Sequence, residues 1–363
     1  MGLTQGATTL DERAALDFVL TLRQRWADVL YPALRREYDR AVAEAGPAAA
    51  PPGTGRAAVP IVRDLPSYPW FSWVERGQQK MMWRAVSDTV ERRWEELAPL
   101  LGEVAEPVGT LELDPGLALP DWYTAIDIHL QPGGVWSDDR AAFVYEEGAQ
   151  IVMLRDNDEY RFHTLFTRTA LPPGPHARIV DVGCGFGKST RPLAAAFPGA
   201  EVWGVDLAAP VLRLAHATAE RQGTPLHLRQ ADAAATGLED GSCDVVTGTM
   251  VLHEMPVDAV AATLREAGRL ARPGGAVRFL EFALTGDPCR DATVYEHGER
   301  NNEPFLPGLL DADVEGMCAD AGLVGARWVP FDERGGGLQP DGWPPDRMEW
   351  HFPWAVLCAE RAS

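Results

Sequence analysis

No hydrophobic run in the sequence approaches the roughly 18 apolar residues of a membrane-spanning helix. The first residues show no charged leader before an apolar segment, and Gly6 stands where an N-myristoylation motif has Ser or Thr. Five cysteines, an odd number with no C-x-x-C pair, argue against a disulfide framework and a thiolate zinc site. We therefore expect a soluble, cytoplasmic protein with reduced thiols.

Positive charge is also scarce in this chain. Lysine and arginine number 33 against 53 aspartates and glutamates, for a formal net charge of −20, and Lys80 and Lys188 are its lysines. A surface this acidic repels phosphate backbones and anionic lipids. We expect no nucleic-acid or membrane partner, and a small molecule instead.

The N-terminal half has helical patterns. A chain of 363 residues allows about two domains. Residues 11–45 predict one long helix, and residues 75–101 predict another with an apolar stripe at steps of three and four. The Pro/Gly-rich residues 46–60 between them predict a flexible loop. We predict that residues 1–164 form a mainly helical cap that contributes to the substrate site and to a homodimer.

From His176 onward, short β-rich runs alternate with helical ones, which is typical of a mostly parallel sheet covered by helices on both faces. Strands are predicted at residues 178–182, 200–205, 226–230, 244–249, 276–282, 326–331 and 354–360, with a helix at 309–321. The predicted fold class is therefore α/β: a seven-stranded, doubly wound, Rossmann-like sheet over residues 165–363, with a helical N-terminal cap.

A glycine-rich loop follows the first predicted strand. The sequence DVGCGFG at residues 181–187 runs from an apolar strand into Gly-x-Gly-x-Gly and then a helix, so the backbone can turn sharply and approach a ligand closely. The dinucleotide fingerprint would need glycine at position 188, which is lysine, and the P-loop spacing fails as well. The loop therefore predicts a cofactor other than a dinucleotide.

Aspartates stand at the ends of the next two predicted strands. Asp206 follows the glycines by about 20 residues, where a carboxylate can accept both hydroxyls of a ribose. Asp232 ends the following strand and can accept from an exocyclic adenine amine. Together with the loop, this order of residues predicts a nucleoside-binding edge of the sheet.

With these residues, the sequence from 165 to 363 resembles the class I S-adenosylmethionine-dependent methyltransferases. The segments MVLHE (250–254) and LARPGG (270–275) also look like later motifs of quinone-biosynthesis C-methyltransferases. The resemblance implies that the loop holds the methionine part of the cofactor, Asp206 the ribose, and Asp232 with Ala233 the adenine. The implied cofactor-binding residues are Asp181, Gly183, Cys184, Gly185, Gly187, Asp206, Leu207, Asp232, Ala233 and Met250.

Histidines are the candidates for making an acceptor nucleophilic, because the sulfonium of the cofactor is already activated. His253, with Glu254 beside it, follows the fourth predicted strand at the ligand-binding edge. His297 and Arg300 lie in a polar stretch after the fifth strand, and His129 comes from the N-terminal half. The other five histidines are interpreted as structural or solvated.

If His129, His253 and His297 converge, three imidazoles with one open position would suit a divalent metal such as zinc. Such an ion can bind a carbonyl oxygen and acidify the adjacent carbon. This placement is similar to that expected of 2-oxo acid C-methyltransferases, which supply β-methylated amino acids for peptide natural products. That resemblance implies a polar lid at residues 299–305, in which Arg300 pairs with a substrate carboxylate.

The leading hypothesis is methylation, in secondary or amino-acid metabolism, of a small, anionic, carbonyl-containing metabolite at carbon, through a metal- or base-stabilised enolate. Alternatively, His253 acts as a general base, oriented by Glu254, in an O- or C-methyltransferase of an aromatic or quinone-like acceptor. A third hypothesis is a cyclase that binds S-adenosylmethionine without transferring its methyl group. A nicotinamide oxidoreductase is a fourth, which Lys188 argues against.

Overall fold

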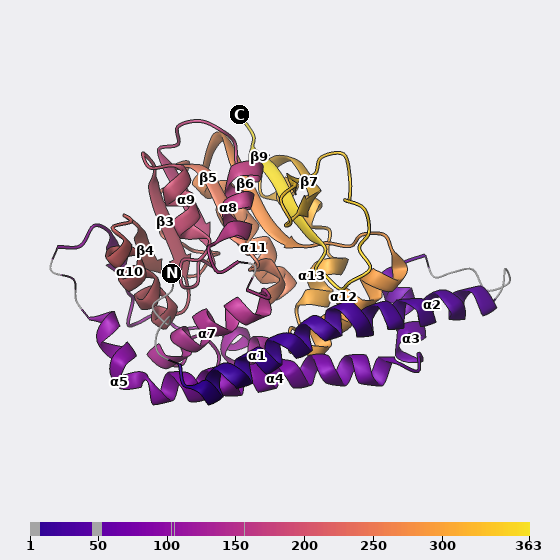
Figure 1. Ribbon diagram of the computed structural model, residues 1–363. Coiled ribbons are helices and arrows are strands. Elements are labelled where there is room, and N and C mark those ends of the chain that lie inside the picture. Colours follow the sequence, from indigo (N-terminus) through magenta and orange to yellow (C-terminus); the bar gives the residue numbers. More distant parts are fainter. Residues whose placement is uncertain (1–7, 46–52, 103, 105, 156) are drawn as a thin grey trace.

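The computed structural model describes residues 8–45, 53–102, 104, 106–155 and 157–363. Its centre is one mixed sheet in the order β1-β4-β3-β2-β5-β6-β9-β7-β8 (Figure 1). The strands are β1 (Thr110–Glu112), β2 (Arg178–Val182), β3 (Glu201–Asp206), β4 (His227–Gln230), β5 (Cys243–Thr249), β6 (Ala271–Phe282), β7 (Leu323–Asp332), β8 (Gly337–Leu338) and β9 (Trp354–Arg361).

Helices surround this sheet and extend below it. They are α1 (Leu10–Arg25), α2 (Tyr31–Ala45), α3 (Gly55–Arg63), α4 (Tyr68–Arg92), α5 (Trp94–Leu97), α6 (Asp121–Thr124), α7 (Asp139–Val152), α8 (Arg161–Ala170), α9 (Thr190–Ala196), α10 (Ala209–Gln222), α11 (Val257–Leu270), α12 (Pro288–Arg300), α13 (Leu306–Asp311) and α14 (Val314–Asp320). A five-residue π-helical turn, Trp26–Leu30, joins α1 to α2.

The middle of the sheet is parallel and buried on both faces. Ile179 of β2 lies in register with Val202 of β3 on one side and Val245 of β5 on the other. These strands are short apolar runs, as expected when helices cover both faces. The end of the sheet beyond β6 is antiparallel, with β9 between β6 and β7. The predicted doubly wound α/β fold is confirmed.

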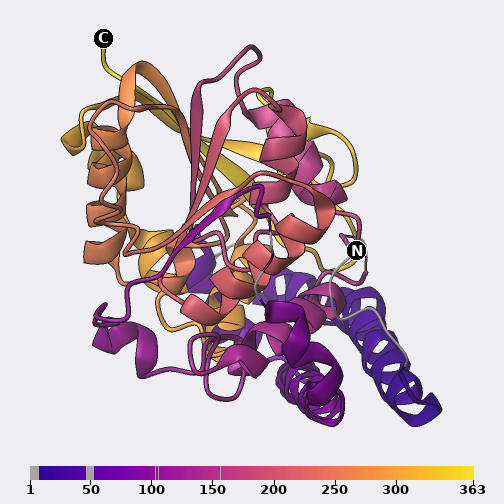
Figure 2. The ribbon, with the colours of Figure 1, turned by 90° about the vertical axis from the view of Figure 1, so that its left-hand side faces the viewer.

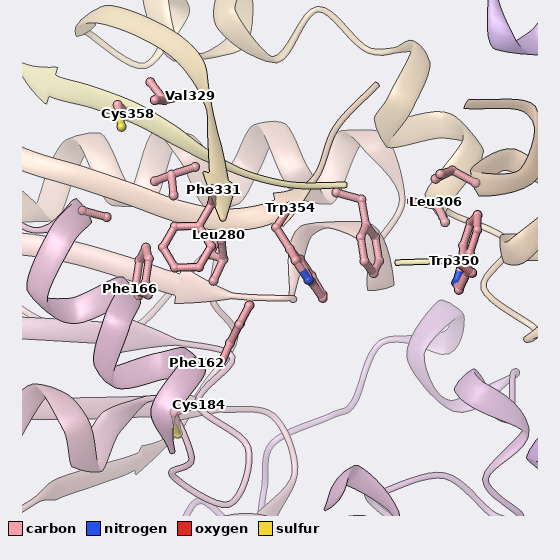
Figure 3. Close-up of a cluster of buried hydrophobic side chains, with 14 of the residues drawn as sticks. Phe162, Phe166, Cys184, Leu280, Leu306, Val329, Phe331, Trp350, Trp354 and Cys358 are labelled. Atoms are coloured by element: carbon pink, nitrogen blue, oxygen red, sulfur yellow. The ribbon is translucent and has the colours of Figure 1, made fainter. Parts of the chain in front are cut away.

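Alternate residues of a central strand pack into two hydrophobic cores, one on each face of the sheet. Ile179 packs in a core with α8, α9 and α10, whereas Val180 packs on the other face with α11 and α14. Figure 2 shows these helical layers on either side of the sheet. In the first core, Phe162 of α8 meets Phe331 and Trp354 edge-on or tilted, with ring centroids 5.6 and 5.2 Å apart (Figure 3).

The N-terminal helices α1 to α4, here called the cap helices, lie along one end of the sheet. The helix formed by α1 and α2 runs beside α4 below the strands (Figure 1). Trp26 stacks on Phe71 with centroids 4.8 Å apart, and its indole N–H donates to the Phe71 carbonyl at 3.0 Å. Helix α12, from the C-terminal half, packs against α3 and α4. The two halves of the chain therefore build this end together.

The structure corrects several predicted boundaries. Seven strands were expected, and β1 and β8 extend the sheet to nine; β1 comes from the N-terminal half and pairs with β4. The boundary at 164/165 falls inside α8. The predicted helix 309–321 is interrupted between α13 and α14, where the Asp313 side chain accepts from the Gly316 N–H at 2.9 Å and starts a new helix.

The predicted loop at 46–60 is partly wrong. Residues 46–52 lie outside the described residues, but α3 begins at Gly55, where the Thr54 side chain accepts from the Ala57 N–H at 3.3 Å. Gly55 packs so closely on Asp291 that an added Cβ would clash with it. Tertiary packing has therefore overridden the Pro/Gly-rich composition.

In the described part of the chain, every helix is too short or too polar to span a bilayer. The homodimer expected through the N-terminal helices stays a prediction. Trp70 and Trp73 of α4 are 68% and 71% exposed, so such a contact would have aromatic surface available to it.

Candidate active site: two joined cavities at the carboxyl edge

The glycine-rich loop opens directly from the carboxyl end of β2. Gly183, Gly185 and Gly187 have φ of +67°, +50° and +77°, in the left-handed region that favours glycine. A Cβ on Gly183 would clash with the side chain of Val251. The loop is fixed to the neighbouring strand, because the Gly185 N–H donates to the Asp206 carboxylate at 2.8 Å.

A first cavity lies in front of this loop. Seven of the ten predicted cofactor-binding residues line it; they are Gly183, Gly185, Asp206, Leu207, Asp232, Ala233 and Met250. Asp206 also accepts from the Ala208 N–H at 2.9 Å, and Asp232 accepts from the Ala234 N–H at 2.8 Å. Burial raises the pKa of Asp206 to about 6, although the N–H groups of Ala208 and Gly185 oppose the shift.

The other three predicted cofactor residues do not line the first cavity. Asp181 is buried beneath the loop, where the hydroxyls of Ser189 and Thr190 donate to its carboxylate at 2.6 Å each, so it supports the loop from behind. Gly187 faces α10 at Ala215. Cys184 lines a second cavity instead.

This second cavity lies between the glycine loop and the cap helices. Arg23 of α1 and Gln79 and Trp83 of α4 form part of its wall. The residues common to both cavities are His129, Tyr145, Gly183, Gly185, Thr249, Met250 and Glu254. The two cavities are therefore neighbours that share a wall, here called the junction.

Strained backbone occurs at the junction. Met250, directly after β5, has φ of +56°, and His129 also has φ of +56°. Neither is glycine, so each conformation is disfavoured by about 1–2 kcal/mol and persists only because its surroundings enforce it. Trp83 contributes to this, because its indole N–H donates to the His129 carbonyl at 2.6 Å.

His253 lines the second cavity and is held by a buried carboxylate. Its Nδ1 lies 2.7 Å from Oε2 of Glu281, whose Oε1 accepts from the N–H groups of Val251 and Leu252 at 2.6 Å each. Burial disfavours the charged imidazole, but Glu281, together with Glu303 and Glu254, outweighs burial and raises the pKa of His253. This carboxylate fixes the ring orientation and leaves Nε2 as the second ring nitrogen.

His129 lies between two carboxylates. Its Nε2 is 2.8 Å from Glu254 and its Nδ1 is 2.9 Å from Glu303. Burial opposes protonation, yet Glu303 and Glu254 together raise the pKa of His129 to about 10. His129, His253 and Glu254 each offer a ligand atom, and these atoms lie within 4.8 Å of one another.

The predicted three-histidine group does not come together in the structure. The third residue of the compact group is Glu254 and not His297. His297 lines the second cavity, but its Nδ1 lies 2.6 Å from Glu75 and its Nε2 3.4 Å from Glu303. Burial disfavours charge on His297, and these two carboxylates nonetheless raise its pKa.

Arg300 does not act as predicted either. It lies at the end of the buried helix α12, rather than in a polar lid, and lines neither cavity. Its guanidinium pairs with Glu75 of α4, which also binds Asn301 at 3.1 Å. Arg300 therefore joins α12 to the cap.

Sequence reasoning missed several residues of the site. Tyr145 of α7 lines both cavities, and Arg23 and His163 line the second. His163, interpreted as structural, contacts Asn157 at 2.8 Å, and burial holds its pKa well below the usual range. Among the missed residues, Glu281 alone could have been found from the sequence, because it is a carboxylate inside an apolar strand.

Comparisons with known proteins agree with this geometry. Residues 179–275 match a family model described as "Methyltransferase domain". The chain is 36% identical over 138 residues to the demethylmenaquinone methyltransferase of Thermus thermophilus, covering 38% of this chain and 60% of that protein. It is 32% identical over 134 residues to the ubiquinone/menaquinone biosynthesis C-methyltransferase UbiE of Burkholderia multivorans, covering 37% and 54%.

An uncharacterised protein of Haemophilus influenzae is 30% identical over 172 residues, which cover 41% of this chain and 68% of that protein. The first two relatives are thus matched over about half to 60% of their length. Among solved structures, a phosphoethanolamine N-methyltransferase of Haemonchus contortus aligns with a TM-score of 0.44 and 16% identity, covering 60% of this chain and 48% of that one. By its family match and its named relatives, the chain contains a methyltransferase domain at residues 179–275.

Proposed function

We propose that this protein transfers a methyl group from S-adenosylmethionine in the first cavity to a small, anionic acceptor in the second. The acceptor is of the 2-oxo acid type, and the methyl group goes to the carbon next to its carbonyl. The observation that carries this proposal is the junction. Two cavities that share His129, Tyr145, Met250 and Glu254 as a common wall can bring a sulfonium methyl and an acceptor carbon within reach.

The first cavity suits S-adenosylmethionine. Its carboxylates Asp206 and Asp232 follow adjacent parallel strands, where ribose hydroxyls and an adenine amine can donate to them. Gly183 and Gly185 of the glycine loop line this cavity, so backbone without side chains faces the space proposed for the methionine part. The bound cofactor supplies an already activated methyl group.

His253 is proposed to prepare the acceptor. With Nδ1–H donating to Glu281, its Nε2 can take the proton from the carbon next to the acceptor carbonyl. The resulting enolate carbon forms a bond to the methyl carbon, and the methyl–sulfur bond breaks with its electron pair going to sulfur. Tyr145 and protonated His129 line the wall where the enolate oxygen gains charge.

A divalent cation such as zinc fits the same wall. His129, His253 and Glu254 would hold it, and the second shell is present because Glu281 binds the Nδ1 of His253. When bound, such an ion polarises the carbonyl oxygen of the acceptor and acidifies the adjacent carbon. The cap helices exclude water from an enolate in either case.

A second candidate function is general-base methylation of an aromatic or quinone-like acceptor. Two observations favour it: relatives of this chain carry the names of quinone-biosynthesis methyltransferases, and aromatic rings line the second cavity. Those rings belong to Trp83, Phe186, Phe282, Phe352 and Trp354. A flat acceptor ring could stack among them.

The test is product analysis with methyl-labelled S-adenosylmethionine, offering phenylpyruvate and a naphthoquinol separately. We expect phenylpyruvate to become heavier by one methyl, with NMR locating the label at the carbon next to the carbonyl. Methylation of the quinol alone would favour the second candidate. A converted product of unchanged mass would indicate cyclisation, and neither product would contradict both candidates.

The metal is tested by elemental analysis of the purified protein. On the metal route, about one equivalent of zinc would be present, lost in His253→Ala and Glu254→Gln and retained in His297→Ala, because His297 lies outside the compact group. His297→Ala is the matched control, since it also removes a buried, carboxylate-bound imidazole. A metal-free protein with full activity would exclude the metal and leave the base route.

A further inference from the structure

Arg23 is a buried cation in the wall of the second cavity. It is 8% exposed, and it comes from α1, on the cap side of that cavity. In the described part of the chain its side chain makes one hydrogen bond, from Nη1 to the Gln79 side-chain oxygen at 3.0 Å, and it has no ion-pair partner. Other donors of the guanidinium are therefore available to a ligand.

A buried guanidinium without a carboxylate partner is costly, because charge taken out of water is normally paired. Arg290 and Arg300, which are also buried, have such partners in Asp346 and Glu75. Burial lowers the pKa of Arg23, and attraction to Glu75 and Glu303 opposes this shift without forming an ion pair. The site is thus incomplete as it stands.

We infer that Arg23 binds the carboxylate of the acceptor, so that the cap rather than α12 selects for an anionic substrate. This inference rests on the proposed function, and it gives Arg23 the role that sequence analysis assigned to Arg300. The planar guanidinium matches a carboxylate with two parallel hydrogen bonds.

The connection between Arg23 and the junction makes this anchor useful for catalysis. Gln79 accepts from Arg23 and donates through its side-chain nitrogen to the His129 carbonyl at 3.2 Å. In a 2-oxo acid the carboxylate is bonded directly to the carbonyl carbon. When Arg23 binds the carboxylate of such an acid, the carbonyl group of the acid therefore lies next to Arg23. The Gln79 side chain connects Arg23 to the His129 carbonyl at the junction.

Lys188 is the competing anchor in the same cavity. It comes from the glycine loop, and burial lowers its pKa to about 8, against the attraction of Asp158 and Glu146. Arg23 is the better carboxylate ligand because its planar fork can donate to both carboxylate oxygens, whereas Lys188 is a point charge whose pKa burial lowers.

The experiment is calorimetric titration of the full protein loaded with S-adenosylhomocysteine, using phenylpyruvate and its uncharged methyl ester. We expect the acid to bind and the ester to bind at least tenfold more weakly. Arg23→Gln should weaken acid binding by roughly 10- to 100-fold, the scale of hydrogen bonds to charged groups, and leave the ester unaffected. Arg23→Lys should recover part of the loss.

The matched control is Arg25→Gln, an exposed arginine two residues along the same helix, which should bind like the unchanged protein. S-adenosylhomocysteine affinity, measured for every variant, reports folding and tests the proposed function separately. The inference is wrong if acid and ester bind alike, if neither binds the cofactor-loaded protein, or if Lys188→Gln rather than Arg23→Gln removes the preference for the acid. Retained cofactor binding together with methylation of a neutral acceptor would then leave the methyltransferase function intact.

Discussion

Replacing Asp206 by asparagine tests the cofactor site, because this carboxylate has two tasks. One oxygen accepts from the Gly185 N–H at 2.8 Å and the other from the Ala208 N–H at 2.9 Å, so it fixes the glycine loop. Its remaining acceptor capacity faces the first cavity, where ribose hydroxyls would donate. An asparagine keeps the shape but loses the charge and one of the two acceptor oxygens.

The magnitude follows from these contacts. Hydrogen bonds to a charged group contribute about 1.5–3 kcal/mol, so Asp206→Asn should weaken S-adenosylhomocysteine binding by roughly 10- to 150-fold. The pKa of Asp206 is raised to about 6 by burial, and the ionised form is the one that accepts both hydroxyls. Affinity should therefore be nearly constant above pH 7 and fall roughly tenfold by pH 5, as the carboxyl takes up a proton.

Isothermal titration with S-adenosylhomocysteine between pH 5 and 8 measures both effects, with circular dichroism at each pH to follow folding. Asp244→Asn is the matched control. Asp244 also accepts from a backbone N–H, that of Arg178 at 3.1 Å, but it lies outside the first cavity at the start of β5. Unchanged affinity in Asp206→Asn, or a flat pH profile in the original protein, would refute this account of the site.

Two further predictions concern stability and are measured by urea denaturation. Gly183→Ala and Gly274→Ala both place a side chain at a φ near +70°, but only Gly183 meets a neighbour, so we expect losses of about 2–4 and 1–2 kcal/mol respectively; equal losses would contradict the packing at Gly183. Glu75→Gln leaves Arg300 as a buried, uncompensated cation and should cost about 3–5 kcal/mol, whereas Glu299→Gln at the exposed pair with Arg63 should cost under about 1 kcal/mol. Comparable values for these last two would mean that the buried pair is not structural.

The fold and the cofactor edge were predictable because their signals are local. An apolar strand, a glycine loop and the aspartate after the next strand lie within about 30 residues of one another, and parallel topology brings them to one edge. The strand β1 was missed for the opposite reason. It has three residues, and it exists only because it pairs with β4, more than 100 residues later.

The surroundings of the second cavity were predictable only in part. His253 and Glu254 follow β5 directly, so their place at the edge could be read from the strand. The role of Arg300 could not, because its partner Glu75 is 225 residues away, on a helix of the cap. A polar stretch such as 295–303 looks alike in sequence whether it faces solvent or, as here, neutralises charges from a helix packed upon it.

Ion pairs between the cap and α12 account for most of the buried polar residues around the second cavity. Glu75 of the cap binds His297 and Arg300 of α12, while Glu303, just after α12, reaches His129. These contacts both attach the cap and set the charge of the histidines that line the second cavity. A cap that moved away would remove Arg23 and would leave the carboxylates around His297 solvated. The contacts that hold the cap in place are therefore also the contacts that set the charge of the site.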